Sequence, residues 1–392
     1  MRIPLLFVSA LLLGAGARAQ ESPLQSLLAR AGELRLAESD AWARLLHYRR
    51  GPLGSMRSEA RGADFFLSPS GSGSPRAELE ATLRAFFEQP EPDEQKRQHA
   101  QCRFPARYAW LKERLAFDPR ELPEQPCARF KAWRGAPDSL TLVYADAYLN
   151  NPSSMYGHTF LRLDERGRED GGLLDYSLNF AAQTDTRSGV LFALFGLTGG
   201  FPGRFSLLPY YMKVQEYNNL ESRDLWEYRL DLGTRTVDML LRHAWELGSA
   251  HFDYYFLTKN CSYQLLPLLE AADPSLRLSE KLPLQVVPAD TVRLLRESGL
   301  AGPPRYRPSL VSRMLEGRKG LSKDELGLAA GLAQGPEEGP LEELGRLPPE
   351  RQAAVLDSSL DLLRYRAGFK EKDAPEVLRK EAGLLKRRSR LA

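Results

Sequence analysis

Between Ser139 and Glu270 the spacing of the apolar residues changes, and this change constrains the fold more than any other feature of the chain. β-branched and aromatic residues alternate here with polar ones, a period of two that is typical of half-buried strands. The segments with this pattern are SLTLVYADAYL, GHTFLRLD, GLLDYSLNFAA and DLWEYRLDL. On both sides, apolar residues recur every three or four positions, which predicts helices. The sequence therefore predicts an α+β fold.

The 392 residues are enough to bury a sizeable core, and we expect more than one packed unit. The pattern divides the chain into four parts: residues 1–19, an export signal; 20–138, a helical region; 139–275, the strand-rich core; and 276–392, a second helical region with proline breaks. No internal repeat or low-complexity segment interrupts this order.

The first twenty residues have the layout of a secretory signal peptide. Arg2 precedes an apolar run, and Ala17-Arg18-Ala19 forms an A-x-A cleavage site with Gln20 as the first mature residue. The alternative is an uncleaved anchor, although the run is short for a membrane span. Cleavage removes two arginines and lowers the formal charge from +3 to +1. We expect a periplasmic protein, and a chain so close to neutral gives no reason to expect a nucleic-acid partner.

Export makes the three cysteines informative. Cys102 and Cys127 lie 25 residues apart, and a disulfide closing that loop would stabilise the fold by roughly 3 kcal/mol. This pairing leaves Cys261 as an odd thiol. Such a residue is either reactive or a small buried hydrophobe, and free cysteines are commonly buried.

The stretch TKNCSYQLL places Cys261 directly after Asn260, a good N-cap residue, so the thiol falls in the first turn of a predicted helix. The helix dipole favours a thiolate there. A base must come from one of five histidines: His47, His99, His158, His243 and His251. His158 is the best candidate because it begins a predicted strand directly after Gly157, where a rigid sheet can present a catalytic side chain. His251, ten residues before the thiol, is the second choice, and the other three are expected to be surface or packing residues.

Three stretches together resemble the Lnb-type periplasmic domain family: CRFPARYAWL, YLNNPSSMYGHTFLRL with the following YSLNFAA, and HFDYYFLTKNCSYQLLPLLE. The resemblance covers roughly residues 100–275. The order of the histidine strand and the cysteine helix is also similar to that of circularly permuted NlpC-type, papain-like thiol enzymes. The resemblance implies an antiparallel sheet packed against a cysteine-bearing helix, flanked by helical regions.

On this resemblance Cys261 matches the nucleophile and His158 the base. The third, orienting position falls on the strand DYSLNF, where Asp175, Ser177 and Asn179 share one face. Asn179 is preferred because an amide oxygen can fix the histidine tautomer, and Asp175 is the alternative. The neighbouring candidates for an oxyanion site or its lining are Tyr254, Tyr255, Asn260 and His251.

The family resemblance implies lipoprotein N-acylation, in which a thiolate takes a fatty acyl chain from a phospholipid and passes it to a lipoprotein N-terminus. The uncharged stretch Ser188–Gly203 is consistent with a lipid substrate, either as a mobile apolar loop at a membrane surface or as the lining of an acyl tunnel. The alternative is a buried hairpin or core helix. The basic tail Arg379–Arg390 could contact anionic lipid or simply be a solvated end.

Two other functions stay open. Longer family members continue into a further C-terminal region, whereas this chain ends at Ala392, so the same dyad could act on cell-wall peptide amides instead. A non-catalytic periplasmic binding module with an inert Cys261 is the third reading. The sequence lacks C-x-x-C and H-x-x-x-H ligand spacing, so we expect neither a metal nor a cofactor.

Overall fold

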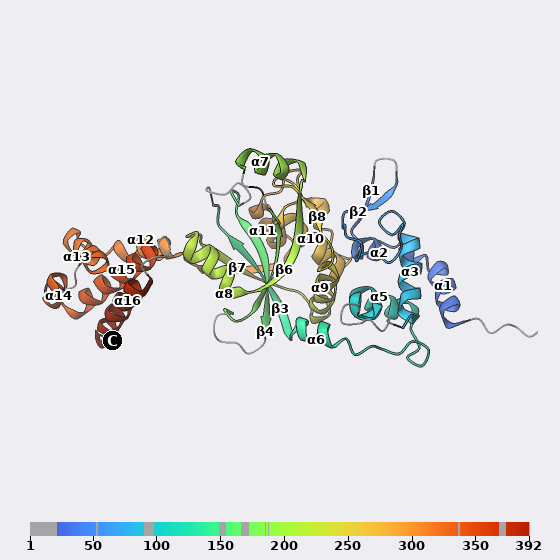
Figure 1. Ribbon diagram of the computed structural model, residues 1–392, viewed down its shortest axis with the longest axis horizontal. Coiled ribbons are helices and arrows are strands. Elements are labelled where there is room, and N and C mark those ends of the chain that lie inside the picture. Colours follow the sequence, from blue (N-terminus) through green and yellow to red (C-terminus); the bar gives the residue numbers. More distant parts are fainter. Residues whose placement is uncertain are drawn as a thin grey trace, which may run out of the picture.

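A computed structural model describes residues 22–51, 54–89, 98–148, 154–165, 172–184, 186, 188–335, 338–367 and 374–391. Three parts follow one another along the longest axis: an N-terminal helical region, a central sheet with its helices, and a C-terminal helical region (Figure 1). The expected signal peptide lies outside the described residues. Among the helices that the structure describes, none combines the length and the hydrophobicity needed to cross a bilayer.

Within the described chain, seven strands form one antiparallel sheet in the order β8-β6-β5-β4-β3-β7-β9. They are β3 (Pro137–Ala145), β4 (His158–Glu165), β5 (Tyr176–Ala182), β6 (Phe201–Pro209), β7 (Leu225–Leu230), β8 (Phe252–Tyr254) and β9 (Ala301–Arg307). The four segments expected from their alternation are β3, β4, β5 and β7, and the α+β class is confirmed. The sheet also extends past residue 275, the expected end of the core, because β9 pairs with β7.

The alternation in the central strands separates two packed faces. Leu161 and Leu178 face the main apolar core, on the side covered by α9 (Thr234–Leu247) and α10 (Cys261–Ala272). Phe160, one position earlier, belongs to a second cluster beneath α8 (Tyr210–Val214) and the π-helix η2 (Gln215–Leu220). Since both faces are covered, the central strands are buried on both sides.

The N-terminal region is helical but also holds a short hairpin. Its elements are α1 (Pro23–Glu33), η1 (Leu36–Glu38), α2 (Asp40–Leu45), β1 (Tyr48–Arg50), β2 (Met56–Ser58), α3 (Pro75–Phe87), α4 (Ala100–Arg103), α5 (Pro105–Leu115) and α6 (Ala128–Arg134). Helix α2 ends at Leu45, and two residues later His47 adopts a left-handed backbone conformation that turns the chain into β1. The expected Cys102–Cys127 disulfide is present.

A buried ionic contact joins the N-terminal region to the sheet unit. The Arg107 side chain of α5 is fully buried and lies 2.7 Å from Glu78 Oε1 and 3.5 Å from Glu246 Oε2. Glu246, on α9, also accepts hydrogen bonds from the backbone N–H groups of Ala106 and Arg107, which begin α5. This carboxylate satisfies backbone donors in the first turn of α5 that have no partner within the helix. The buried apolar residues of the two regions also form one continuous core.

The C-terminal region packs around an apolar core of its own. Its helices are α12 (Leu310–Arg318), α13 (Lys323–Gln334), α14 (Glu338–Gly345), α15 (Pro349–Ala367) and α16 (Ala374–Arg388), followed by η5 (Ser389–Leu391). Helix α11 (Pro288–Glu297) packs in the sheet unit against α10, β3 and β9, and β9 leads directly into α12.

The apolar stretch Ser188–Gly203 differs from both expectations. It forms α7 (Gly189–Thr198), an exposed helix in which only Gly196 is buried, and then enters β6. The mobile loop is wrong because Ser188 caps a regular helix, and the buried hairpin or core helix is wrong because most of the side chains face solvent.

Candidate active site

Asn260 and the helix it caps fix the position of the thiol. The Asn260 Oδ1 atom accepts hydrogen bonds from the backbone N–H groups of Ser262 and Tyr263, as an N-cap does, and Cys261 is the first residue of α10. The Asn260 Nδ2 group donates to the carbonyls of Phe256 and Val286, which locks the cap itself. The expected helix start is therefore where the sequence indicated.

His158 is the first residue of β4 and reaches the same place from the sheet. Gly157 before it has φ +101°, a conformation that L residues rarely adopt, and a Cβ atom there would overlap Tyr144 and the Ala145 carbonyl. The Nε2 atom of His158 lies 2.6 Å from Asn179 Oδ1. Because an amide oxygen can only accept, Nε2 carries the proton and Nδ1 is left for the thiol.

The environment of Cys261 favours the thiolate. Burial raises the pKa of this thiol, but the charge of His158, its hydrogen bond, and donors from the Thr159 backbone and the Ser262 hydroxyl together lower it to about 6. These favourable contacts outweigh desolvation, which is the pattern of a nucleophilic rather than a structural cysteine. Most of the thiol population is therefore ionised at neutral pH.

Tyr254 closes the other side of the thiol. Its hydroxyl lies 3.4 Å from the backbone nitrogen of Cys261, which donates to it, and its ring stacks on Phe180. Burial, followed by the charge of Cys261, raises the pKa of Tyr254 well above its usual value, so the phenol stays protonated. Because the phenol oxygen accepts from the Cys261 N–H, its own O–H is left as a donor next to the residue that carries the sulfur, where a developing oxyanion would form.

Three of the residues expected at the site lie elsewhere. Asp175 lies directly before β5, whereas Asn179 is in the middle of that strand, and the Asp175 carboxylate is 3.6 Å from Arg162 Nε. Tyr255 packs its ring against Gly199 at the end of α7. His251 forms a backbone bridge with Arg61. The geometry therefore places Asn179, not Asp175, against the histidine.

The other three histidines have packing roles. His47 and His243 form a buried pair with their Nε2 atoms 3.0 Å apart. His99 caps α4 by accepting from the Gln101 backbone N–H. None of these contacts involves the thiol, in line with the expectation that they are surface or packing residues.

Tyr217 is a site residue that the sequence analysis missed. Its ring centroid lies 5.6 Å from that of His158, on the face away from α10. The guanidinium of Arg223 covers the Tyr217 ring at 4.7 Å and also donates to the carbonyls of Ala145 and Asp146. Tyr217 belongs to a π-helix, and such segments occur frequently at functional sites. No local pattern in YYMKVQEYNNL indicates this position.

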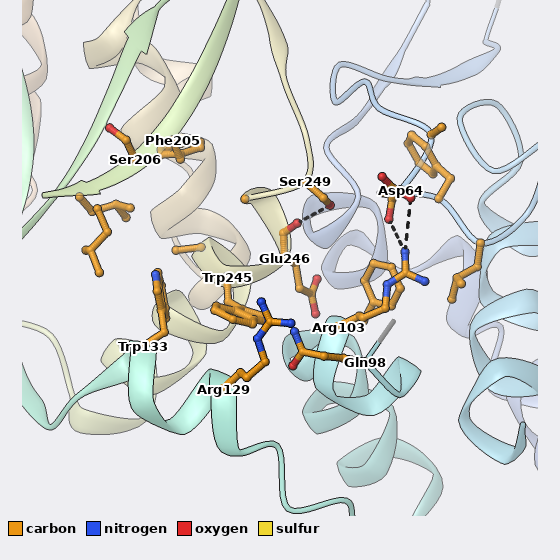
Figure 2. A pocket seen from close by; sticks show the side chains of 18 residues that line it. Asp64, Gln98, Arg103, Arg129, Trp133, Phe205, Ser206, Trp245, Glu246 and Ser249 are labelled. Atoms are coloured by element: carbon orange, nitrogen blue, oxygen red, sulfur yellow. Dashed lines mark hydrogen bonds and ion pairs between the residues drawn. The ribbon is translucent and has the colours of Figure 1, made fainter. Parts of the chain in front are cut away.

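The site is closed to solvent in this structure. Cys261 is 2% exposed and His158 5%. A cavity of about 710 Å³ lies elsewhere, between the N-terminal region, α9 and the middle of β6 (Figure 2). Its labelled side chains include Trp133, Trp245 and Arg129, and none of its lining residues belongs to the cysteine site. Within the described residues, no group of His, Cys, Asp and Glu side chains is arranged to hold a metal ion.

Comparison with protein families finds three matches along the chain. Residues 34–114 match a domain of unknown function (DUF7843), and residues 304–392 match another (DUF7842). No curated protein and no solved structure matches. The segment that holds the sheet, His158, Asn179 and Cys261, residues 129–298, matches the Lnb N-terminal periplasmic domain, which supports the family expected from the motifs and a periplasmic location.

Proposed function

We propose that this protein is a periplasmic thiol acyltransferase with a permuted papain-like core. In this proposal Cys261 takes a fatty acyl chain from a phospholipid as a thioester and passes it to the α-amino group of a lipoprotein N-terminus. The observation that carries the proposal is the position of His158, whose Nε2 lies 2.6 Å from Asn179 Oδ1 and whose charge is the main influence lowering the pKa of the buried Cys261 thiol to about 6. The lipid donor is supported by the Lnb domain match and by the exposed apolar helix α7.

In the first half-reaction the Cys261 thiolate attacks the ester carbonyl carbon of the phospholipid. A carbon–sulfur bond forms, the carbon–oxygen bond to glycerol breaks, and His158 donates the Nδ1 proton to the leaving alkoxide, releasing a lysophospholipid. Asn179 holds Nε2–H and so keeps the ring in the orientation that aims Nδ1 at the reaction. The Tyr254 hydroxyl, which accepts from the Cys261 N–H, would donate its own proton to the oxyanion.

In the second half-reaction the neutral α-amine of the acceptor attacks the thioester. A carbon–nitrogen bond forms, the carbon–sulfur bond breaks, and His158 takes the proton that the amine loses. The products are an N-acyl amide and the restored thiolate–imidazolium pair, so the cycle consumes no cofactor. The buried site suits this sequence of steps because water, a competing nucleophile, is kept from the thioester.

Intact-mass analysis of the mature protein, incubated with an alkyne-tagged phospholipid in detergent, tests the proposal. We expect an acyl adduct on the wild type that hydroxylamine removes, none on Cys261→Ser, and a strongly reduced amount on His158→Ala. His251→Ala is the matched control, because that histidine lies away from the thiol and should leave the adduct unchanged.

Addition of a diacylated peptide with a free N-terminal cysteine then tests transfer, and the adduct should decay as the N-acyl peptide appears. If no adduct forms although Cys261 is alkylated rapidly at neutral pH, the phospholipid donor is wrong and cell-wall peptide amides become the substrate class to test. A wild-type thiol that also fails to react would contradict the enzyme assignment altogether.

A further inference from the structure

Helix α7 carries an unusual surface for a short helix. Its sequence, GVLFALFGLT, holds no charged residue. Val190 is 79% exposed, Leu194 51% and Leu197 57%, and Leu191 and Phe195 are also exposed. Isolated exposed apolar residues are ordinary, but five on ten consecutive positions form a patch of the kind that marks an interaction site.

The opposite side of α7 is firmly anchored. The Phe192 ring packs against Phe201 and Phe256, with centroids 5.5 Å and 5.2 Å apart. The Phe256 backbone N–H donates to the Gly196 carbonyl at 2.8 Å. A residue larger than glycine would not fit at position 196, because its Cβ atom would overlap the Phe256 ring. The exposed face of α7 is therefore held in a fixed direction by a packed aromatic cluster.

We propose that α7 docks this protein onto a phospholipid bilayer by burying its exposed face at the boundary between headgroups and acyl chains. The polar atoms of the helix favour lipid over a protein partner. The Thr198 hydroxyl donates to the Leu194 carbonyl, and the Ser188 hydroxyl accepts from the Leu191 N–H. A protein interface carries about one hydrogen bond per 100–200 Å², whereas the one exposed hydroxyl of α7, that of Thr198, already donates its proton within the helix.

The charges around α7 fit an anionic bilayer surface. The helix itself is neutral, and the first ionic side chain after it is Arg204, half-buried on β6, with hydrogen bonds to Gln183 and to the Ala250 carbonyl. An uncharged apolar helix that is followed along the chain by a cationic side chain suits acyl chains beneath anionic headgroups. At ten residues α7 is too short to span a bilayer, so it lies in the interface.

A short chain of hydrogen bonds connects α7 to the thiol. Gly196 O accepts from Phe256 N–H, Phe256 O accepts from Asn260 Nδ2–H, and Asn260 caps the helix that begins at Cys261. Docking of α7 therefore sets the position of the Cys261 helix relative to the membrane. This second part rests on the proposed function, in which the acyl donor is a membrane phospholipid; docking itself does not depend on it.

Vesicle flotation of the full chain tests docking, with phosphatidylethanolamine and phosphatidylglycerol as the lipids. The measurement uses Cys261→Ser as the parent, so that no thioester can contribute to binding and failure of the proposed chemistry leaves the result intact. Leu194→Asp in this background should lower the bound fraction at least tenfold. Leu315→Asp is the matched control, because Leu315 on α12 is 54% exposed and lies outside the patch. It should float like the parent.

Equal flotation of Leu194→Asp and the parent, or no flotation of the parent, would overturn the proposal. A parent that self-associates in solution and becomes monomeric with Leu194→Asp would overturn it too, because α7 would then be covered by a second copy. Equal thermal unfolding midpoints for parent and variant are expected, since Leu194 is exposed, and they separate lost docking from lost folding.

Discussion

Helices α7 and α10 are both short and rich in apolar residues, yet they have opposite surroundings. In α10 ten of twelve residues are buried, whereas in α7 only Gly196 is. Each begins at a polar cap, Ser188 for α7 and Asn260 for α10. Composition alone therefore does not separate a core helix from a docking helix. The difference lies in the surroundings: α10 packs on β4, β5 and α9, while α7 is anchored along one side.

The different packing of the two helices also suits their proposed roles. Because α10 is packed along its length, its first residue is held rigidly against β4, which is what a preorganised nucleophile needs. Because the outward side chains of α7 are exposed, they can pass from water to another environment without disturbing the packing of the core. Phe256 and Asn260 connect the two helices.

The largest difference in the free energy of unfolding is expected when one leucine in each helix is truncated to alanine. Leu266 of α10 is fully buried, so Leu266→Ala should lower the free energy of unfolding by about 2–5 kcal/mol through lost burial and a cavity. Leu194→Ala in α7 should change it by no more than about 0.5 kcal/mol. Chemical denaturation of both variants measures the difference, and equal losses would show that α7 is part of the folded core.

A smaller effect is expected at the contact between α7 and Phe256. A Cβ atom at Gly196 would overlap the Phe256 ring, so Gly196→Ala should cost about 1–3 kcal/mol through overpacking. Gly189→Ala is the control in the same helix, because a Cβ there meets no atom within 4 Å. Thermal unfolding should separate the two variants. Similar midpoints would mean that the aromatic anchor is loose.

The two caps give the smallest contrast. Asn260→Ala should cost about 1–2 kcal/mol, since the side chain accepts from two backbone N–H groups and donates to two carbonyls. Ser188→Ala should cost about 0.5 kcal/mol, because its single cap bond to Leu191 is 3.5 Å long. A larger loss for Ser188→Ala than for Asn260→Ala would contradict the view that α10 is the anchored helix of the pair.

Local pattern predicted the elements that form the site but not all of the sheet. Strands β4 and β5 alternate cleanly, and Asn260 before an apolar run marks a helix start. Strands β6 and β9 were missed because each contains proline and glycine, which argue against a strand except at an edge or a bulge. Strand β8 has only three residues, too few for any periodicity to show.

The choice between the two orienting candidates depended on register. Asp175 and Asn179 share one face of the strand, so alternation could not separate them. The pairing of Arg162 with Ser177 places Asp175 toward Arg162 and Asn179 toward His158. Tyr217 was not predictable for a similar reason: its contact with His158 joins residues 59 positions apart through tertiary packing alone.

The pH dependence of Cys261 alkylation by iodoacetamide tests the central claim most directly. Burial slows the reaction by the same factor at every pH, so the midpoint of the rate profile, rather than its height, reports the thiol pKa. The thiolate forms as pH rises through the pKa, so the wild-type rate should reach its plateau above a midpoint near pH 6. In His158→Ala burial remains while the main favourable partner is lost, and the midpoint should rise to about 8.5 or higher. His251→Ala should match the wild type. A wild-type midpoint already near 8.5, or one that His158→Ala leaves in place, would contradict the account of Cys261 as an activated nucleophile.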